Sequence, residues 1–412
     1  MGVDESSRSR SVDGQTSAPG LRGLVPFDTT ARTRLIFGPG SLDRLESVLD
    51  PLGASRVLVV TDPGIARAGH LEAVVTRLGG VGRRVHAVFA GVRENPDTLC
   101  VDECLAVARE FRPDAFVGLG GGSSMDTAKA CNFLLTNGGR MRDYWGVGKA
   151  TRPMLPFVAI PTTAGTGSEC QSAALISDAD THVKMACLDA KATACAAILD
   201  PVLTVSQPAG VTACTGIDAL AHAVEAAVTT KRNPISAMYA REAFALSAPA
   251  FPRVLAYPSD VDARGRMLLG AALAGMAIEQ SMLGAAHAAA NPLTARFGTV
   301  HGVAVGLMLP HVVRLNAADP EARGIYAELA LAAGLGRADD DAARLAEALA
   351  GHLEGLLDAA TMPRTLRRLG VDEGLVPALA EEAGRQWTAS FNPVRVVAAD
   401  FERLYRGALG AV

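Results

Sequence analysis

Short apolar runs alternate with helical stretches along the chain from Leu35 to about Asp200. The clearest apolar runs lie at residues 56–60, 86–92, 114–120 and 156–163. These runs are apolar on both faces, which is typical of strands that are covered by helices from both sides. The alternation therefore predicts an α/β domain that is built on a parallel sheet.

The second half of the chain has a different pattern. After about Pro208, strand signals nearly vanish and Ala- and Leu-rich segments with helical spacing dominate, at residues 212–228, 233–251, 263–280 and 342–360. We therefore expect an α/β domain over residues 26–205 and an all-helical domain over residues 206–412. The first 25 residues are rich in Ser, Gly and Arg and lack an apolar run, which predicts a disordered tail rather than a secretory signal.

Charge and cysteine content exclude several classes of protein. The chain carries 39 Lys and Arg residues against 43 Asp and Glu residues, and therefore lacks the basic surplus that nucleic-acid binding needs. No stretch of about 20 uninterrupted apolar residues is present, so we expect a soluble protein without a membrane span. The seven cysteines are an odd number spread along the chain, which favours reduced thiols in the cytoplasm.

A glycine-rich segment follows the apolar run at 114–120. Gly120, Gly121 and Gly122 are consecutive, and a helix is expected to begin at Ser123 or Ser124. Glycines let the backbone approach an anion closely, and the free N–H groups at a helix start attract negative charge. The segment is thus a candidate phosphate-binding turn, although its spacing does not meet the full dinucleotide fingerprint. A simple strand-to-helix turn is the alternative.

Two further features lie where predicted strands end. Residues 161–169, PTTAGTGSE, offer hydroxyl and amide donors to a phosphate or a ribose directly after a strand. Asp62 follows the run at 56–60, and a carboxylate there can accept the two ribose hydroxyls of an adenosine and repel a 2′-phosphate, which favours NAD over NADP. A plain Asp-Pro-Gly turn explains Asp62 equally well.

The helical half contains a candidate metal site. Asp218 and His222 are four residues apart in a helical segment, so both side chains point from one face. His287 and His301 follow on segments that could converge with it. One carboxylate and three imidazoles suit a divalent transition metal, either Fe²⁺ or Zn²⁺. His311 is a rival ligand that we interpret as a packing residue.

Three motifs together resemble signatures of the iron-activated (class III) alcohol dehydrogenase family. These are GGGSSMDTAKA (120–130), PTTAGTGSE (161–169) and TGIDALAHAVEA (215–226), which occur in that family's order and spacing. The resemblance runs from about Phe37 to His311, with a weaker match at Asn392-Pro393. It implies a dehydroquinate-synthase-like fold, in which a dinucleotide lies across the α/β domain and a metal lies in the cleft against the helical domain.

The resemblance also implies roles for individual residues. The metal ligands would be Asp218, His222, His287 and His301. The cofactor-binding residues would be Asp62, Asn95, Gly121, Gly122, Ser123, Asp126, Thr162, Thr163, Thr166 and Lys184. The implied cofactors are NAD(H) and one Fe²⁺ or Zn²⁺ ion, and the implied reaction is hydride transfer between the nicotinamide and a small alcohol or aldehyde. Relatives commonly pair through an N-terminal strand, here residues 31–38, so a homodimer is expected.

One position departs from the family. The family usually places a further histidine four residues after its third ligand, where this chain has Asn291. Helical spacing is expected to aim Asn291 into the same cleft, as a catalytic-site residue that cannot titrate near neutral pH. Proton delivery would then use water, a ribose hydroxyl or another side chain. Two alternatives stay open: a dehydroquinate-synthase-like enzyme that uses NAD and a metal, and a cofactor-binding protein that has lost its activity.

Overall fold

The computed structural model of the chain describes residues 26–79 and 84–410. The tail expected at residues 1–25 lies outside the described residues. The chain divides into two units at Thr30 and Ala31, and residues 26–30 contain neither helix nor strand. All helices and strands described below belong to the second unit.

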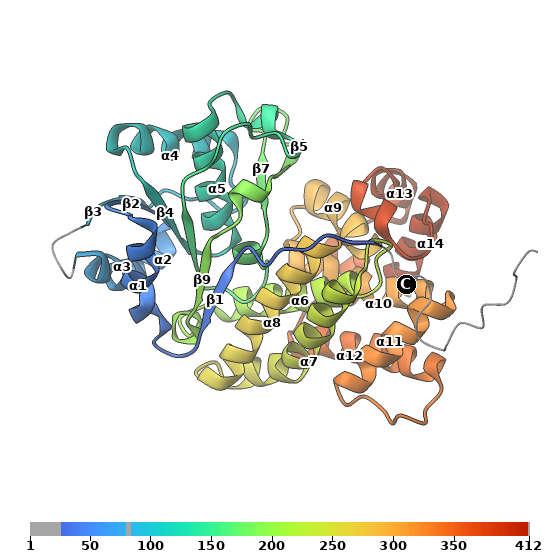
Figure 1. Cartoon of the computed structure of the whole chain (residues 1–412). Coiled ribbons are helices and arrows are strands. Elements are labelled where there is room, and N and C mark those ends of the chain that lie inside the picture. Colours follow the sequence, from blue (N-terminus) through green and yellow to red (C-terminus); the bar gives the residue numbers. More distant parts are fainter. Residues whose placement is uncertain (1–25, 80–83, 411–412) are drawn as a thin grey trace, which may run out of the picture. The chain divides into compact units, whose positions relative to one another are not determined.

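A six-stranded, fully parallel sheet forms the first half of this unit (Figure 1). Its strand order is β1-β9-β6-β4-β2-β3. The strands are β1 (Arg34–Phe37), β2 (Arg56–Val60), β3 (Val85–Phe89), β4 (Ala115–Gly120), β6 (Phe157–Pro161) and β9 (Ala196–Leu199). The parallel sheet predicted from the apolar runs is therefore confirmed. The run predicted at 86–92 leaves the sheet after Phe89, and β1 lies at one edge of the sheet.

Helices cover both faces of the sheet, because successive strand residues point to opposite sides. Val57 and Val59 pack in a core with α1 (Leu45–Leu49) and α3 (His70–Gly79). Leu58 and Val60 pack in another core with α4 (Thr98–Phe111) and α5 (Gly122–Asn137). The short helix α2 (Pro63–Arg67) follows β2.

A second, smaller sheet was not predicted. It has the order β5-β8-β7 and consists of β5 (Gly146–Val147), β7 (Ala173–Ser177) and β8 (Lys184–Leu188). Strands β7 and β8 pair antiparallel, and the turn between them contains His182 with a positive φ of 59°. Strands β7 and β8 follow the segment 161–169 in sequence, whereas β5 precedes it.

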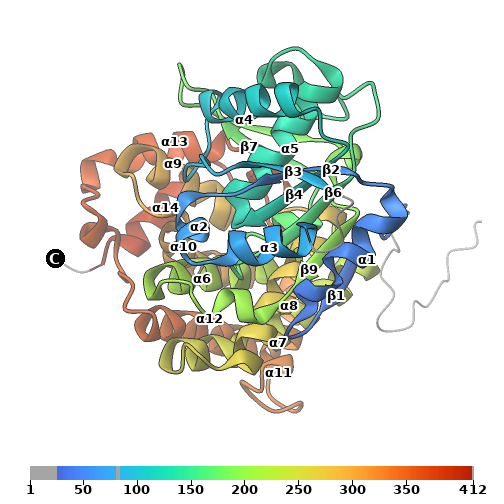
Figure 2. The same cartoon turned by 90° about the vertical axis from the view of Figure 1, so that its left-hand side faces the viewer.

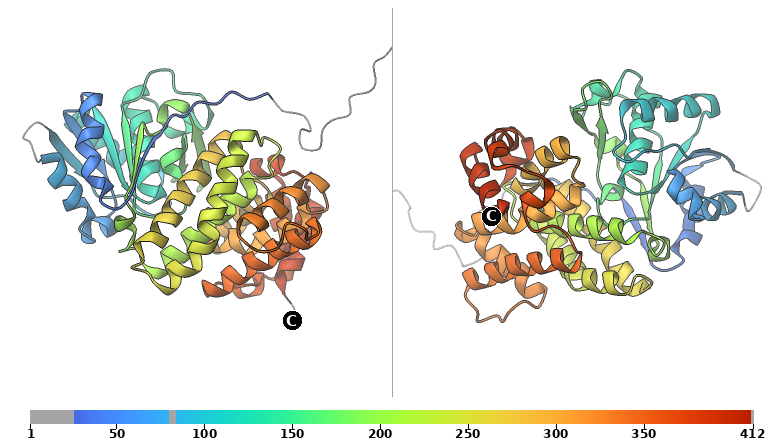
Figure 3. Two further views of the ribbon diagram at one scale, coloured as in Figure 1. Left: turned by 60° about the horizontal axis from the view of Figure 1, so that its bottom comes forward. Right: turned by 180° about the vertical axis from the view of Figure 1, so that it is seen from behind.

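The remaining described chain is helical. The helices are α6 (Ala209–Ala226), α7 (Pro234–Ala256), α8 (Val261–Gln280), α9 (Ala285–Phe297), α10 (His301–Asn316), α11 (Pro320–Ala332), α12 (Ala342–Ala359), α13 (Val376–Gly384) and α14 (Ala398–Leu409). Helix α8 packs on β9 and on the segment before α6, so it lies beside the sheet (Figure 2). Figure 3 shows the sheet and the helices from two further sides. The four helical segments predicted from sequence all form helices.

Side chains fix where several of these helices begin. Asn233 caps α7 by accepting from the N–H groups of Ile235 and Ser236, at 3.0 Å each. Asp260, Asp319 and Asp341 cap α8, α11 and α12 in the same way. Such caps satisfy N–H groups that have no partner within the helix. Within the described ranges no single helix has the length and apolar character needed to cross a bilayer, and α8 with α9 meets that test only as a pair bent by 105°.

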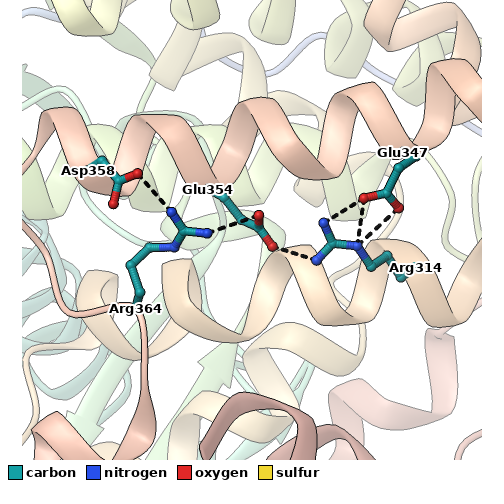
Figure 4. A network of polar contacts seen from close by, with 5 residues as sticks. All are labelled: Arg314, Glu347, Glu354, Asp358 and Arg364. Carbon is teal, nitrogen blue, oxygen red and sulfur yellow. Dashed lines mark hydrogen bonds and ion pairs between the residues drawn. The ribbon is translucent and has the colours of Figure 1, made fainter. Parts of the chain in front are cut away.

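A network of ion pairs joins the end of α10 to α12 (Figure 4). Arg314 bonds Glu347 at 2.7 Å and Glu354 at 2.5 Å, and Arg364 bonds Glu354 at 2.9 Å and Asp358 at 2.7 Å. The hydrogen bond from Arg314 lowers the pKa of Glu354. Glu354 is the shared acceptor, so it couples both arginines.

We predict that Glu354→Gln lowers the free energy of unfolding by about 1 kcal/mol at neutral pH, since the network is partly exposed to solvent. Because the pKa of Glu354 is lower in the folded than in the unfolded chain, its contribution is present above the unfolded pKa and disappears as the pH falls through the folded pKa. Denaturant midpoints of variant and wild type should therefore differ at neutral pH and converge in acid. Glu328→Gln, at an exposed position of α11, is the control, and an equal loss at both pH values would contradict the prediction.

Candidate active site

A cleft of about 880 Å³ lies between the carboxyl ends of the sheet strands and the helices α6, α8, α9 and α10. One wall consists of residues that follow β2, β3, β4 and β6. Ligands of open parallel sheets bind outside these strand ends. The opposite wall comes from the helical half and combines polar side chains with apolar ones, among them Ile278, Leu283 and Val300.

Four predicted ligand side chains converge in this cleft. Asp218 and His222 lie on α6, His287 lies on α9 and His301 is the first residue of α10. The Oδ1 atom of Asp218 is 3.6 Å from Nε2 of His222, 3.6 Å from Nε2 of His287 and 3.9 Å from Nε2 of His301. The ligand atoms of Asp218, His222 and His287 all lie within 4.8 Å of one another, and these residues are buried. The structure thus brings together the four side chains that the sequence analysis named as candidate metal ligands, and their role as ligands stays a prediction.

The chemistry of this cluster fits a divalent cation. Asp218 Oδ1 and His287 Nε2 are buried and have no hydrogen-bond partner in the described part of the chain. Leaving such atoms unpaired in an apolar interior is unfavourable, whereas a cation between them would satisfy both. Burial raises the pKa of Asp218, but the surrounding imidazoles outweigh burial and hold it well below its usual range. Burial lowers the pKa of His301 to about 3, so its imidazole is neutral, as a metal ligand must be.

Glu225 orients one of these imidazoles and was missed in the sequence. One oxygen of its buried carboxylate accepts from the backbone N–H of Ala286 at 2.6 Å, and the other bonds Nδ1 of His287. Burial lowers the pKa of His287, but Glu225 and Asp218 outweigh it and raise that pKa to about 9. Because Nδ1 is held by Glu225, Nε2 faces Asp218. The available signal was spacing, since Glu225 lies seven residues after Asp218 on one helical face.

We predict that Glu225→Gln lowers the affinity for a divalent metal by about 10- to 100-fold, as is typical when the partner of a metal-binding histidine is changed. The amide keeps the shape of the side chain but removes the charge that fixes His287. Competition titration against a metal-binding dye measures the affinity. Glu242→Gln, at an exposed position of α7, should leave the affinity unchanged, and equal affinities of Glu225→Gln and wild type would show that Glu225 has no such role.

All ten predicted cofactor-binding residues line the cleft. Asp62 follows β2, and its Oδ1 accepts from the N–H groups of Gly64 at 2.8 Å and Ile65 at 3.0 Å. The Asp-Pro-Gly turn, which was the alternative interpretation of Asp62, is therefore present. The Asp62 carboxylate lines the cleft as well. Asn95 follows β3 and has a positive φ of 50°.

The glycine-rich segment forms a tight connection from β4 to α5. Gly120 has a φ of +143°, and a β-carbon there would lie 2.5 Å from Oγ of Ser124. Gly121 precedes α5 and provides no side-chain cap, so the first N–H groups of the helix are free of side-chain acceptors. A helix start of this kind binds anions. The predicted strand–turn–helix is thus confirmed.

The threonines approach this helix start from the neighbouring strand. A β-carbon on Gly122 would lie 2.9 Å from the side chain of Thr166, and one on Gly121 would lie 3.3 Å from Thr163. Thr162 Oγ1 is buried and has no hydrogen-bond partner within residues 26–79 and 84–410. Hydroxyl groups and helix N–H groups therefore face one part of the cleft, across from the metal cluster.

A buried lysine behind this wall was also missed. Lys129 is fully buried. Its Nζ donates to the carbonyl of Ser168 at 2.6 Å and to the hydroxyl of Ser168 at 2.8 Å. It also donates to the carbonyls of Gln171 and Ala173, at 2.8 and 3.0 Å. Asp126 accepts from the Ser168 hydroxyl at 2.7 Å. Burial lowers the pKa of Lys129 and raises that of Asp126. This pair therefore fixes the chain that follows the threonines.

The remaining predicted residues lie as follows. Lys184 is the exposed first residue of β8 and lines the cleft. Asn291 is not among the cleft-lining residues, and its amide donates to Oε1 of Gln386 at 3.0 Å. Its catalytic role stays a prediction. His311 lies outside the cleft lining on α10, next to Gly407 of α14.

The cleft thus combines the carboxyl ends of parallel strands with an Asp-His₃ cluster, an arrangement that suits an enzyme that uses a dinucleotide and a divalent metal. Two family descriptions match the chain: "Iron-containing alcohol dehydrogenase" over residues 32–201, and "Fe-containing alcohol dehydrogenase family, C-terminal" over residues 212–409. The chain belongs to the iron-containing alcohol dehydrogenase family and is an oxidoreductase that acts on CH–OH groups.

Relatives with assigned names support this assignment. The chain is 34% identical to the NAD-dependent methanol dehydrogenase of Bacillus methanolicus, over 91% of this chain and 97% of the relative. It is 36% identical to the 1,3-propanediol dehydrogenase of Klebsiella pneumoniae, over 89% and 95% of the two chains. Among solved structures, a 1,3-propanediol oxidoreductase superposes with a TM-score of 0.89 at 32% identity, covering 93% of this chain and 100% of that one.

Proposed function

We propose that this chain transfers hydride between NAD(H) and a small alcohol or aldehyde, with a divalent ion held by Asp218, His222, His287 and His301. One observation carries the proposal: a buried carboxylate oxygen, which has no hydrogen-bond partner among the described residues, faces three imidazole nitrogens in the cleft that is also lined by the start of α5. The name of the methanol dehydrogenase relative supports NAD as the cofactor, as does a sulfoacetaldehyde reductase structure in complex with NAD⁺ (TM-score 0.84, 27% identity). Fe²⁺ and Zn²⁺ both suit this ligand set.

The chemistry would come from the bound groups, and the chain would bind and orient them. A divalent ion polarises a carbonyl oxygen or lowers the pKa of an alcohol, and the nicotinamide accepts or donates the hydride. The N–H groups of Gly122 and Ser123 and the hydroxyls of Thr162, Thr163 and Thr166 would hold the phosphates. Asn95, Gly121, Asp126 and Lys184 line the same wall. Ile278 and Leu283 line the opposite wall and would exclude water there.

Proton exchange is assigned to water or to hydroxyl groups in the cleft. An amide cannot titrate near neutral pH, and the Asn291 amide is bonded to Gln386. Asn291 would then tune the pocket rather than relay a proton.

The alternative of a dehydroquinate-synthase-like reaction has less support. That reaction needs Lys and Arg side chains around a substrate phosphate. The basic residues that line the cleft in the described chain are Arg67, Arg93 and Lys184, and all three come from the α/β side rather than the helical wall. The reading as a protein without activity rests on Asn291 alone, whereas the four ligand side chains are all present.

Further proposals concern the context of the enzyme. We propose a homodimer that pairs at the β1 edge, because an edge strand offers unpaired backbone groups to a second chain. We also propose a cytoplasmic location, and a domain boundary near residues 205–206, between the end of β9 at Leu199 and the start of α6 at Ala209.

Metal removal tests the proposed function. Purified protein should contain a divalent metal, bind NADH, and oxidise NADH with one or more members of a panel of small aldehydes. Chelation should abolish turnover, and Fe²⁺ or Zn²⁺ should restore it, because polarisation of the substrate oxygen depends on the ion. Asp218→Asn should lose metal while its NADH affinity stays close to that of wild type. Full turnover by metal-free protein would contradict the proposal.

Asp62→Ser tests the choice of cofactor. Serine can still cap α2, as Asp62 does, but it removes the charge that would face a 2′-phosphate. We expect the ratio of kcat/KM for NADPH to that for NADH to rise about tenfold or more, since like charges in contact are strongly unfavourable. Asp62→Asn keeps the size of the side chain and should change the ratio in the same direction. An unchanged ratio in both variants would show that Asp62 acts only as a helix cap.

A further inference from the structure

The loop after β6, residues 162–167, touches two helices of the helical half through its backbone. At Gly165, a β-carbon would lie 2.5 Å from Cβ of Thr215 and 3.0 Å from its Cα. Thr215 lies on α6, three residues before Asp218. Thr215 is itself held, because its hydroxyl donates to the Val211 carbonyl at 2.8 Å and accepts from Gln207 at 3.0 Å.

The second contact is tighter and involves two glycines. Gly167 has a φ of +64°, and a β-carbon there would lie 2.6 Å from Cα of Gly275 and 2.9 Å from the Ala271 carbonyl on α8. Conversely, a β-carbon on Gly275 would lie 2.4 Å from the carbonyl oxygen of Gly167. The atoms that meet are backbone atoms on both sides, so no side-chain rotation can relieve a substitution here.

The same loop is anchored on its other side. Lys129 binds Ser168 and Gln171 directly after it, and Ser172 donates through its N–H and its hydroxyl to Glu279 of α8, at 2.9 Å each. The loop is thus fixed to α5 by one set of contacts and to α6 and α8 by the other.

These contacts join the two chemical walls of the cleft by a short path. The loop carries Thr162, Thr163 and Thr166 next to the start of α5. Helix α6 carries Asp218 and His222 within two turns of Thr215. A shift of the loop against α6 and α8 would therefore change the separation between the cofactor wall and the metal ligands while leaving each wall intact.

We propose that the close contacts Gly165–Thr215 and Gly167–Gly275 form a positioning element, here called the glycine seam, which sets the distance between the bound nicotinamide and the substrate carbon. This proposal rests on the proposed function. Hydride transfer requires the reacting atoms to approach within about 3–3.5 Å, and a displacement of about 1 Å can reduce the rate 100-fold. A seam of backbone atoms suits this task because it has little freedom to adjust.

The test adds one methyl group to the seam. Gly275→Ala should lower kcat about 10- to 100-fold. Its metal content and the Kd for NADH should stay within about threefold of wild type, since neither wall loses a ligand. The primary deuterium isotope effect on kcat, measured with NADH deuterated at the transferred position, should stay at or rise above its wild-type value, because the step that slows is hydride transfer.

Two further variants make the test decisive. Gly167→Ala adds a methyl group to the same contact from the loop side. It should likewise lower kcat while metal content and NADH affinity are retained, so it replaces Gly275→Ala if that variant does not fold. Gly355→Ala is the matched control, because Gly355 lies on the exposed side of α12 and a β-carbon there meets no atom within 4 Å. Its kinetic constants should equal those of wild type.

The outcomes separate this proposal from the proposed function. Wild-type kcat in both seam variants, or a loss of activity that only follows lost metal or lost folded protein, overturns the glycine seam as a positioning element. A wild-type protein that neither binds metal nor oxidises NADH with any aldehyde overturns the proposed function itself, and the seam proposal with it. A reduced kcat with metal and NADH binding retained supports both.

Discussion

One buried carboxylate without a full set of partners organises the helical half of this protein. Within the described residues, Asp218 points an oxygen without a hydrogen-bond partner at imidazoles from three helices, and Asp218, His222 and His287 are buried. Such an arrangement is unfavourable unless a cation lies at its centre. Helix α10 can bring His301 into it because Gly302 packs on the backbone of α6, where a β-carbon would lie 2.1 Å from the Cys214 carbonyl. The cation site thus depends on the close approach of these helices.

Close contacts of glycine residues also connect the helical half, which contains the cation site, to the sheet. At the threonine loop, the contact of Gly167 with Gly275 brings backbone against backbone, as Gly302 does within the helical half. Close-packed interiors transmit small displacements, because they contain few voids that could absorb them. The two halves contribute different chemistry to the cleft, with helix N–H groups and hydroxyls on one wall and imidazoles on the other. The relative position of the two walls therefore matters for the reaction as much as the identity of the residues on either wall.

Patterns local in sequence predicted much of this structure. Two-sided apolar runs identified four strands of the parallel sheet, and the four-residue spacing of Asp218 and His222 placed both on one helical face. The strands β7 and β8 of the small sheet were missed, because their residues alternate in burial and do not form a two-sided apolar run. Lys129 and Glu225 were missed because their partners lie about 40 to 60 residues away in the chain. Asn291 has the helical spacing of a cleft residue, but Gln386, which is distant in sequence, binds its amide.

Anomalous X-ray scattering from crystals of the purified protein, recorded at the iron and zinc absorption edges, tests the central claim most directly. The account predicts one strong peak within about 2.0–2.2 Å of Asp218 Oδ1 and of the Nε2 atoms of His222, His287 and His301. A peak bonded to other side chains, or imidazoles that point away from an empty centre in catalytically active crystals, would contradict it.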